Sequence, residues 1–194
     1  NYLRRRFGKE TIYLMAHSGG TIFGIQAAAR HPELFAAYIG VAQIVHQVRS
    51  EKLAYDHMLQ AYRAAGNRRM ARALEAAPVT LDGGTPQRYL AVRDRAMHGL
   101  GIGTTRAMRS VFTGLFLPSL AFRGYTPAEK IRFWRAKARN GVSVLWETSL
   151  FVDLSRLVPE LKIPAYFLEG AHDWPGHYAL APEYFRRLPA LLAL

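Results

Sequence analysis

Ala16-His17-Ser18-Gly19-Gly20 is the stretch that decides the fold of this 194-residue chain, because it directly follows the apolar run at residues 11–15. An apolar run that ends on small residues around a serine predicts a strand that turns sharply into a helix. Such a turn lifts the serine hydroxyl out of the sheet, where a base and a substrate can both reach it. Ser18 is therefore a candidate nucleophile, and the turn predicts a serine hydrolase.

Small residues on either side of Ser18 support this interpretation. A strained turn crowds the positions two before and two after the serine, and here these are Ala16 and Gly20. The established pattern is Gly-x-Ser-x-Gly, so Ala16 adds one methyl group to it. Small residues also recur at helical spacing over residues 20–30, which predicts a helix lying close against the sheet. Pro32 is expected to end that helix, since proline disfavours a helical residue before it.

Two further apolar runs complete the predicted sheet. Residues 35–45 are typical of a strand buried on both faces, and residues 162–170 form a similar run that ends at glycine. A strand, a helix and a strand in succession imply parallel neighbours with a right-handed crossover. A last helix is expected at residues 181–188.

The segment at residues 46–154 has the pattern of helices rather than strands. Ser50 is expected to cap a helix that ends near Gly66, and Thr85, followed by proline, is expected to cap another. Residues 126–129, Thr-Pro-Ala-Glu, form a capping box and predict a helix that ends near Asn140. We therefore predict an α/β fold with a parallel sheet core built from residues 1–45 and 155–194, and a helical insertion at residues 46–154.

Composition narrows the classes of protein that are possible. Half of the residues are hydrophobic, which suits a globular core, and the absence of cysteine excludes disulfides and thiolate metal sites. No apolar run approaches the roughly 20 residues that a membrane span needs. The net charge is +12, and residues 46–156 hold 18 Lys and Arg against 8 Asp and Glu. Without a nucleic-acid-binding motif, this charge indicates solvated helix faces.

The chain resembles α/β-hydrolases of the proline iminopeptidase-like group. The resemblance spans nearly the whole sequence and rests on four stretches: residues 6–18, which lead to the serine turn; His31-Pro32-Glu33-Leu34-Phe35; residues 159–164; and Gly170-Ala171-His172-Asp173. It implies a partial α/β-hydrolase fold with a helical cap.

The resemblance also implies roles for particular residues. In this family a serine, an acid and a histidine follow one another along the chain, and Asp173 matches the acid that orients the histidine and stabilises its charged form. The backbone N–H of Gly19 matches one donor of the oxyanion hole. Relatives often place tryptophan at the position of Gly19, so a different acyl-group preference is expected. The implied reaction is cleavage of an N-terminal peptide residue, an ester or a lactone through an acyl-enzyme on Ser18.

Two parts that the resemblance implies are not found in the sequence. One is a His-Gly-Gly loop upstream of Ser18, and the other is the catalytic histidine beyond a further strand. His17, His172 and His177 lie too close to Ser18 or Asp173 along the chain, and are expected to be structural or surface residues. We therefore expect the sequence to be an incomplete reading of a longer enzyme, inactive by itself. No metal and no cofactor are expected.

Two alternatives to a hydrolase remain open. One is a non-catalytic binding protein on the same scaffold, and the other, less favoured, is a basic nucleic-acid-binding module. As partners we expect a small-molecule or peptide substrate, with no nucleic acid and no membrane. We expect a cytoplasmic protein, although the chain begins at Asn1 and a targeting signal upstream of it cannot be assessed. The sequence does not predict the oligomeric state.

Overall fold

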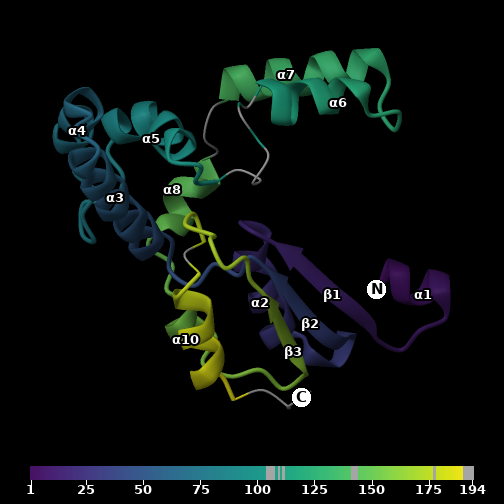
Figure 1. Ribbon diagram of the computed structural model, residues 1–194. Coiled ribbons are helices and arrows are strands. Elements are labelled where there is room, and N and C mark those ends of the chain that lie inside the picture. The colour runs from purple at the N-terminus through teal and green to yellow at the C-terminus, as the bar shows by residue number, and fades with distance from the viewer. Residues whose placement is uncertain (104–107, 109, 111, 141–143, 177, 190–194) are drawn as a thin grey trace.

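Three parallel strands form the sheet of this protein in the computed structural model, which describes residues 1–194 except 104–107, 109, 111, 141–143, 177 and 190–194 (Figure 1). The strands are β1 (Ile12–His17), β2 (Phe35–Val41) and β3 (Ala165–Leu168), in the order β1-β2-β3. The helix α2 (Gly20–Arg30) and a 3-10 turn (Pro32–Leu34) connect β1 to β2. The predicted parallel strand-helix-strand unit is confirmed.

One core cluster forms around this sheet, with residues from the sheet and from helices near both ends of the chain. Its buried members include Ile25 of α2, Tyr38 of β2 and Tyr184 of α10 (Leu180–Arg187). Along β1, partly buried and exposed residues alternate, and Tyr13 and Met15 are 72% and 63% exposed. One face of β1 therefore packs on the core and the other lies open.

The close packing expected between α2 and the sheet is confirmed at Gly24. A Cβ built on Gly24 would lie 2.7 Å from the Cβ of Ala16, so this position accepts no side chain without a shift of its neighbours. The crowding expected at Gly20 was a wrong prediction. A Cβ on Gly20 would meet no described atom within 4 Å, apart from its chain neighbours and its own helix backbone. Ala16 is small because it faces Gly24.

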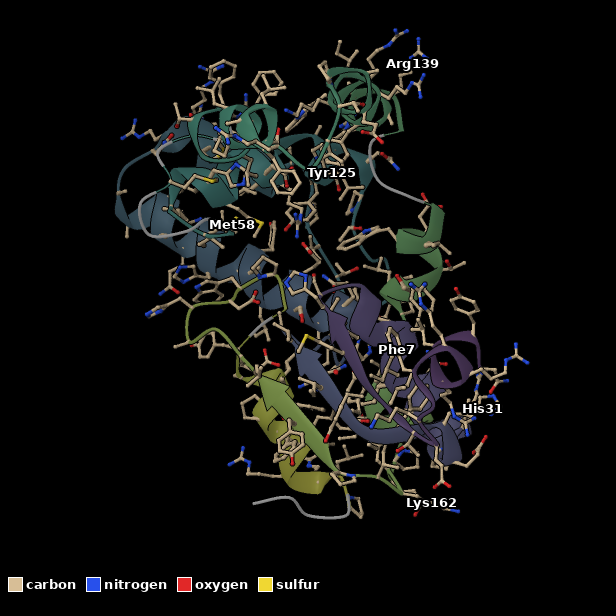
Figure 2. The ribbon with its side chains drawn as sticks, turned by 90° about the vertical axis from the view of Figure 1, so that its right-hand side faces the viewer. Phe7, His31, Met58, Tyr125, Arg139 and Lys162 are labelled. Carbon is tan, nitrogen blue, oxygen red and sulfur yellow. The ribbon has the colours of Figure 1, made fainter. Side chains whose placement is uncertain are left out.

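Helices fill the chain between β2 and β3. They are α3 (Gln47–Ala64), α4 (Arg68–Glu75), α5 (Gln87–Gly99), a π-helical turn (Phe112–Phe116), α6 (Leu117–Ala121), α7 (Pro127–Asn140), α8 (Val144–Leu150) and α9 (Leu154–Leu157), and a short α1 (Tyr2–Phe7) precedes the sheet. A second core cluster joins α3, α4 and α5 around Met58, whereas Arg139 projects outward from α7 (Figure 2). In the part of the chain described here, no helix combines the length and apolarity of a membrane span. The predicted limits of the cap, residues 46–154, stay a prediction.

Of the three predicted helix caps, one is confirmed and two are wrong. The capping box at Thr126 is confirmed. The N–H of Thr126 donates to Glu129 Oε2 at 2.7 Å, and the N–H of Glu129 donates to Thr126 Oγ1 at 3.3 Å. Ser50 was wrongly predicted as a cap: α3 begins three residues earlier, and Ser50 is buried in its first turns. Thr85 was also wrong, since Pro86 takes the N-cap position of α5.

Candidate active site

Three loops that follow the strands meet at one edge of the sheet. Parallel strands bring their carboxyl ends to the same edge, and in this register His17 pairs with Val41, which pairs with Leu168. The next N–H on each strand continues the ladder: Ser18 N–H donates to Val41 O, and Ala42 N–H donates to Leu168 O, both at 2.9 Å. Although Ala42 N–H makes one more ladder bond, strand β2 ends at Val41, four residues before the predicted end.

Ser18 stands on this edge in a left-handed backbone conformation, with φ at +50°. That conformation costs about 1–2 kcal/mol for a residue with a Cβ, and such strain persists only where the surrounding structure enforces it. Here Thr21 donates to Ser18 O from both its N–H, at 2.8 Å, and its hydroxyl, at 2.6 Å. The sharp turn expected from the sequence thus exists, and it leaves the Ser18 side chain exposed.

A buried polar cluster ties the turn at Ser18 to the loop after β2. Thr21 Oγ1 accepts the N–H of Ile44 at 3.0 Å, and the Tyr38 hydroxyl donates to Gln43 Oε1 at 2.7 Å. Burial raises the pKa of Tyr38, with smaller contributions in the same direction from Tyr184 and Glu169, so its hydroxyl stays protonated and able to donate. Both turns at this edge are therefore held in place.

Asp173 lies in the loop that follows β3. Its N–H donates to Gly170 O at 3.0 Å, its Oδ1 accepts the N–H of Gly176 at 2.9 Å, and its carbonyl accepts the N–H of Tyr178 at 2.7 Å. The side chain is partly buried. This loop holds the carboxylate through the backbone N–H of Gly176.

Ser18 and Asp173 line one pocket, of about 760 Å³, although they are far apart in the sequence. The other lining residues are His17, Ala42, Gly103, Met108, Leu115, Gly170, Ala171, His172, Pro175 and Gly176. Gly19 is exposed next to Ser18 at the start of α2, but is not among the lining residues. The structure thus brings together the predicted nucleophile and the predicted acid.

The base of the predicted triad is not assigned. His17 and His172 line the pocket, yet among the described residues no histidine is hydrogen-bonded to Ser18 or Asp173. His177 lies outside the described residues. No described group of three or more His, Asp and Glu side chains is arranged to hold a metal ion.

Glu169 is a residue of this edge that sequence reasoning missed. Its Oε1 accepts the N–H of Gln43 at 2.8 Å, while its buried Oε2 has no partner among the described residues. Burial raises the pKa of Glu169, the bond from Gln43 opposes that shift, and the charge of Asp173 adds to it. The signal available in the sequence was an acidic residue at the very end of an apolar run.

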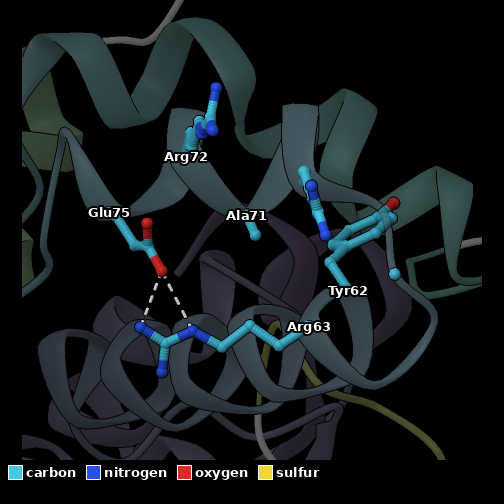
Figure 3. Close-up of a pocket in the computed structure, with 7 residues that line it drawn as sticks. Tyr62, Arg63, Ala71, Arg72 and Glu75 are labelled. Carbon is cyan, nitrogen blue, oxygen red and sulfur yellow. Dashed lines mark hydrogen bonds and ion pairs between the residues drawn. The ribbon is translucent and has the colours of Figure 1, made fainter.

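A second pocket, of about 450 Å³, lies between α3 and α4, and its lining shares no residue with the first (Figure 3). Arg63, Arg68 and Arg72 line it together with Glu75, and Arg63 binds Glu75 through Nε at 3.0 Å and through a second nitrogen at 2.7 Å. Arg68 and Arg72 form no ion pair with a described residue. Part of the basic charge of the chain is concentrated here, away from Ser18.

Comparison with known proteins identifies the family. The profile of the alpha/beta hydrolase fold matches residues 1–191. The chain belongs to the alpha/beta hydrolase fold family. The expected resemblance and fold class are therefore correct, and membership supports a hydrolase.

The relatives of this alpha/beta hydrolase are longer than the chain, and one of them is named as a probable aminopeptidase. The probable aminopeptidase YbaC of Bacillus subtilis (strain 168) is 25% identical over 97% of this chain and 58% of its own length. The crystal structure of VinJ is 17% identical with a TM-score of 0.55, over 97% of this chain and 59% of that one. A proline iminopeptidase-related protein from Thermus thermophilus is 22% identical with a TM-score of 0.43, over 97% and 57%. The chain thus spans somewhat more than half the length of these relatives.

Proposed function

We propose that this alpha/beta hydrolase uses Ser18 as its nucleophile and Asp173 as the acid of a catalytic triad. The observation that carries the proposal is that Ser18, held at φ +50° at the end of β1, lines the same pocket as Asp173. Strained residues cluster at active sites, where the strain holds a side chain in the position that the chemistry requires.

The proposed reaction proceeds through an acyl-enzyme. The hydroxyl oxygen of Ser18 attacks the carbonyl carbon of the substrate while a histidine removes its proton, and the same histidine then protonates the leaving group. Asp173 orients that histidine and stabilises its charged form. The N–H of Gly19, at the start of α2, donates to the oxygen that becomes negative. Water completes the cycle by hydrolysing the ester on Ser18.

We further propose the N-terminal residue of a peptide as the substrate, with esters and lactones as alternatives. The likeness to a probable aminopeptidase favours the peptide. We expect the 194-residue chain by itself to show little turnover, because no histidine among the described residues is hydrogen-bonded to Ser18 or Asp173. A non-catalytic binding protein is the competing function.

Two measurements on separate samples test the proposal. One is reaction of Ser18 with a fluorophosphonate probe. The other is hydrolysis of an aminoacyl p-nitroanilide, a p-nitrophenyl ester and a lactone. The protein expressed from its natural reading frame should react and turn over one of these classes, whereas its Ser18→Ala variant should do neither. A protein that stays unlabelled while folded would support the non-catalytic alternative and contradict the proposal.

A further inference from the structure

One face of α3 lies against the loop that carries Asp173. Gln47 Nε2 donates to Pro175 O at 3.3 Å, and Ser50 Oγ donates to Gly176 O at 3.2 Å. Two turns further along, the ring of His57 stacks on that of Trp174, with 3.9 Å between centroids and 16° between planes. Positions 47, 50 and 57 share one side of a helix with 3.6 residues per turn. The contact therefore comes from the helix face as a unit.

The hydrogen bond from Gln47 reaches the carboxylate of Asp173 through a single peptide group. Pro175 O and the N–H of Gly176 belong to the same peptide unit, whose N–H donates to Asp173 Oδ1 at 2.9 Å. A peptide that accepts a hydrogen bond at its oxygen becomes a better donor at its N–H. The bond from Ser50 holds the next peptide unit of the same loop. Both side chains are thus hydrogen-bonded to the part of the loop that is itself hydrogen-bonded to Asp173.

A buried ion pair fixes Gln47 in turn. Glu51 is fully buried, and its carboxylate receives Nε of Arg93 at 2.8 Å and a second guanidinium nitrogen at 2.5 Å. The Tyr89 hydroxyl donates to the same carboxylate at 3.0 Å, as does Gln47 Nε2. Burial lowers the pKa of Arg93, but the hydrogen bonds and charge of Glu51 outweigh it and raise that pKa, so the guanidinium stays charged.

We propose that Gln47 and Ser50 are positioning residues that hold the Asp173 loop, so that helix α3 sets the place of the triad acid. This inference rests on the proposed role of Asp173. It adds that α3, which lies outside the sheet, sets the position of Asp173 at the sheet edge without contacting the substrate.

Amide hydrogen exchange at Gly176 and Tyr178 tests the positioning role, because both N–H groups donate to Asp173. Ser50→Ala and Gln47→Met should each accelerate exchange at these two amides about fivefold, the change expected for loss of one hydrogen bond. Tyr62→Phe is the matched control, since it removes a buried hydroxyl-to-carbonyl bond of 2.8 Å from the same helix, donated to Ala96 O. Its effect at Gly176 and Tyr178 should stay below about twofold.

Equal acceleration in Ser50→Ala and Tyr62→Phe would mean a general loosening of α3 and would overturn the proposal. Unchanged exchange in both Ser50→Ala and Gln47→Met would also overturn it. If one of these two variants fails to fold, the other still gives the answer. Exchange reports on the loop whether or not the protein is active, so labelling of Ser18 in the unmodified protein reveals a failure of the proposed function separately.

Kinetics of the protein expressed from its natural reading frame supply the second readout. A misplaced acid impairs the chemical step rather than substrate binding, so both variants should lower kcat with KM unchanged, while Tyr62→Phe leaves both constants unchanged. A rise in KM with unchanged kcat would place Gln47 and Ser50 in substrate binding and contradict the positioning role.

Discussion

Ser18 lines the pocket that also holds Asp173, and its backbone has an unfavourable left-handed conformation. Because its φ of +50° suits glycine better than any residue with a Cβ, Ser18→Gly should be more stable than Ser18→Ala by about 1 kcal/mol. Both variants lose the hydroxyl, so the comparison separates strain from chemistry. Urea unfolding of the two variants measures the difference.

Ala42 is the internal control for that comparison, since it has the same φ of +50° at the end of β2 and carries no hydroxyl. Ala42→Gly should stabilise the protein in the same direction. Equal stability of Ser18→Gly and Ser18→Ala would show that the turn is not strained in solution.

Glu169 should make stability depend on pH. Its pKa is raised in the folded protein, mainly by burial, so the folded state binds the proton more tightly than the unfolded chain does. This contribution is fully present below the unfolded pKa, near 4.5, and is lost as pH rises through the folded pKa. Glu169→Gln removes the titration and keeps an oxygen for the N–H of Gln43. The variant should therefore gain stability over the unmodified protein as pH rises from 4 to 8.

Urea unfolding across that pH range measures the effect, with the exposed Glu160→Gln as the control. If the difference in the free energy of unfolding between Glu169→Gln and the unmodified protein stays constant with pH, the raised pKa of Glu169 is contradicted.

At the scale of elements, a buried ion pair between Glu51 and Arg93 links α3 to α5. Arg93→Met leaves the carboxylate of Glu51 buried and without its cation, which should cost about 3–5 kcal/mol of the free energy of unfolding. Adding Glu51→Gln removes the buried charge and keeps an acceptor for Tyr89, so the double variant should be more stable than Arg93→Met alone. Urea denaturation measures the stability of both variants. A double variant less stable than Arg93→Met alone would contradict the buried ion pair between Glu51 and Arg93.

Helices and strands could be predicted from the sequence where the signal depends on bonds between neighbouring residues. The capping box at residues 126–129 works through bonds between neighbours, and it is present as predicted. Ser50 failed as a cap because α3 already begins at Gln47, and the Ser50 hydroxyl donates to the carbonyl of Gly176, 126 residues away. The predicted strand at 35–45 was too long because Ala42 takes a left-handed conformation, which periodicity does not reveal.

At the scale of the molecule, two of the proposed site residues were predicted from the sequence for different reasons. Ser18 was predicted from its turn together with the strand before it and the small-residue helix after it, and Asp173 from its place after the third strand together with the resemblance. Gln47, Glu51 and Glu169 were not predicted, because their partners lie far along the chain and only the folded topology brings them together. Polar residues at positions 47 and 51 on the buried face of a helix were the signal that was available.

We propose that Ser18 is an activated nucleophile whose reactivity depends on Asp173. The most direct measurement is the rate at which a fluorophosphonate probe labels the protein expressed from its natural reading frame, with the site mapped by mass spectrometry and Asp173→Asn compared in parallel. We expect a single label on Ser18 and a rate at least about a hundredfold lower in Asp173→Asn. Absence of label on Ser18 in the folded protein, or labelling that is equally fast in Asp173→Asn, would contradict it.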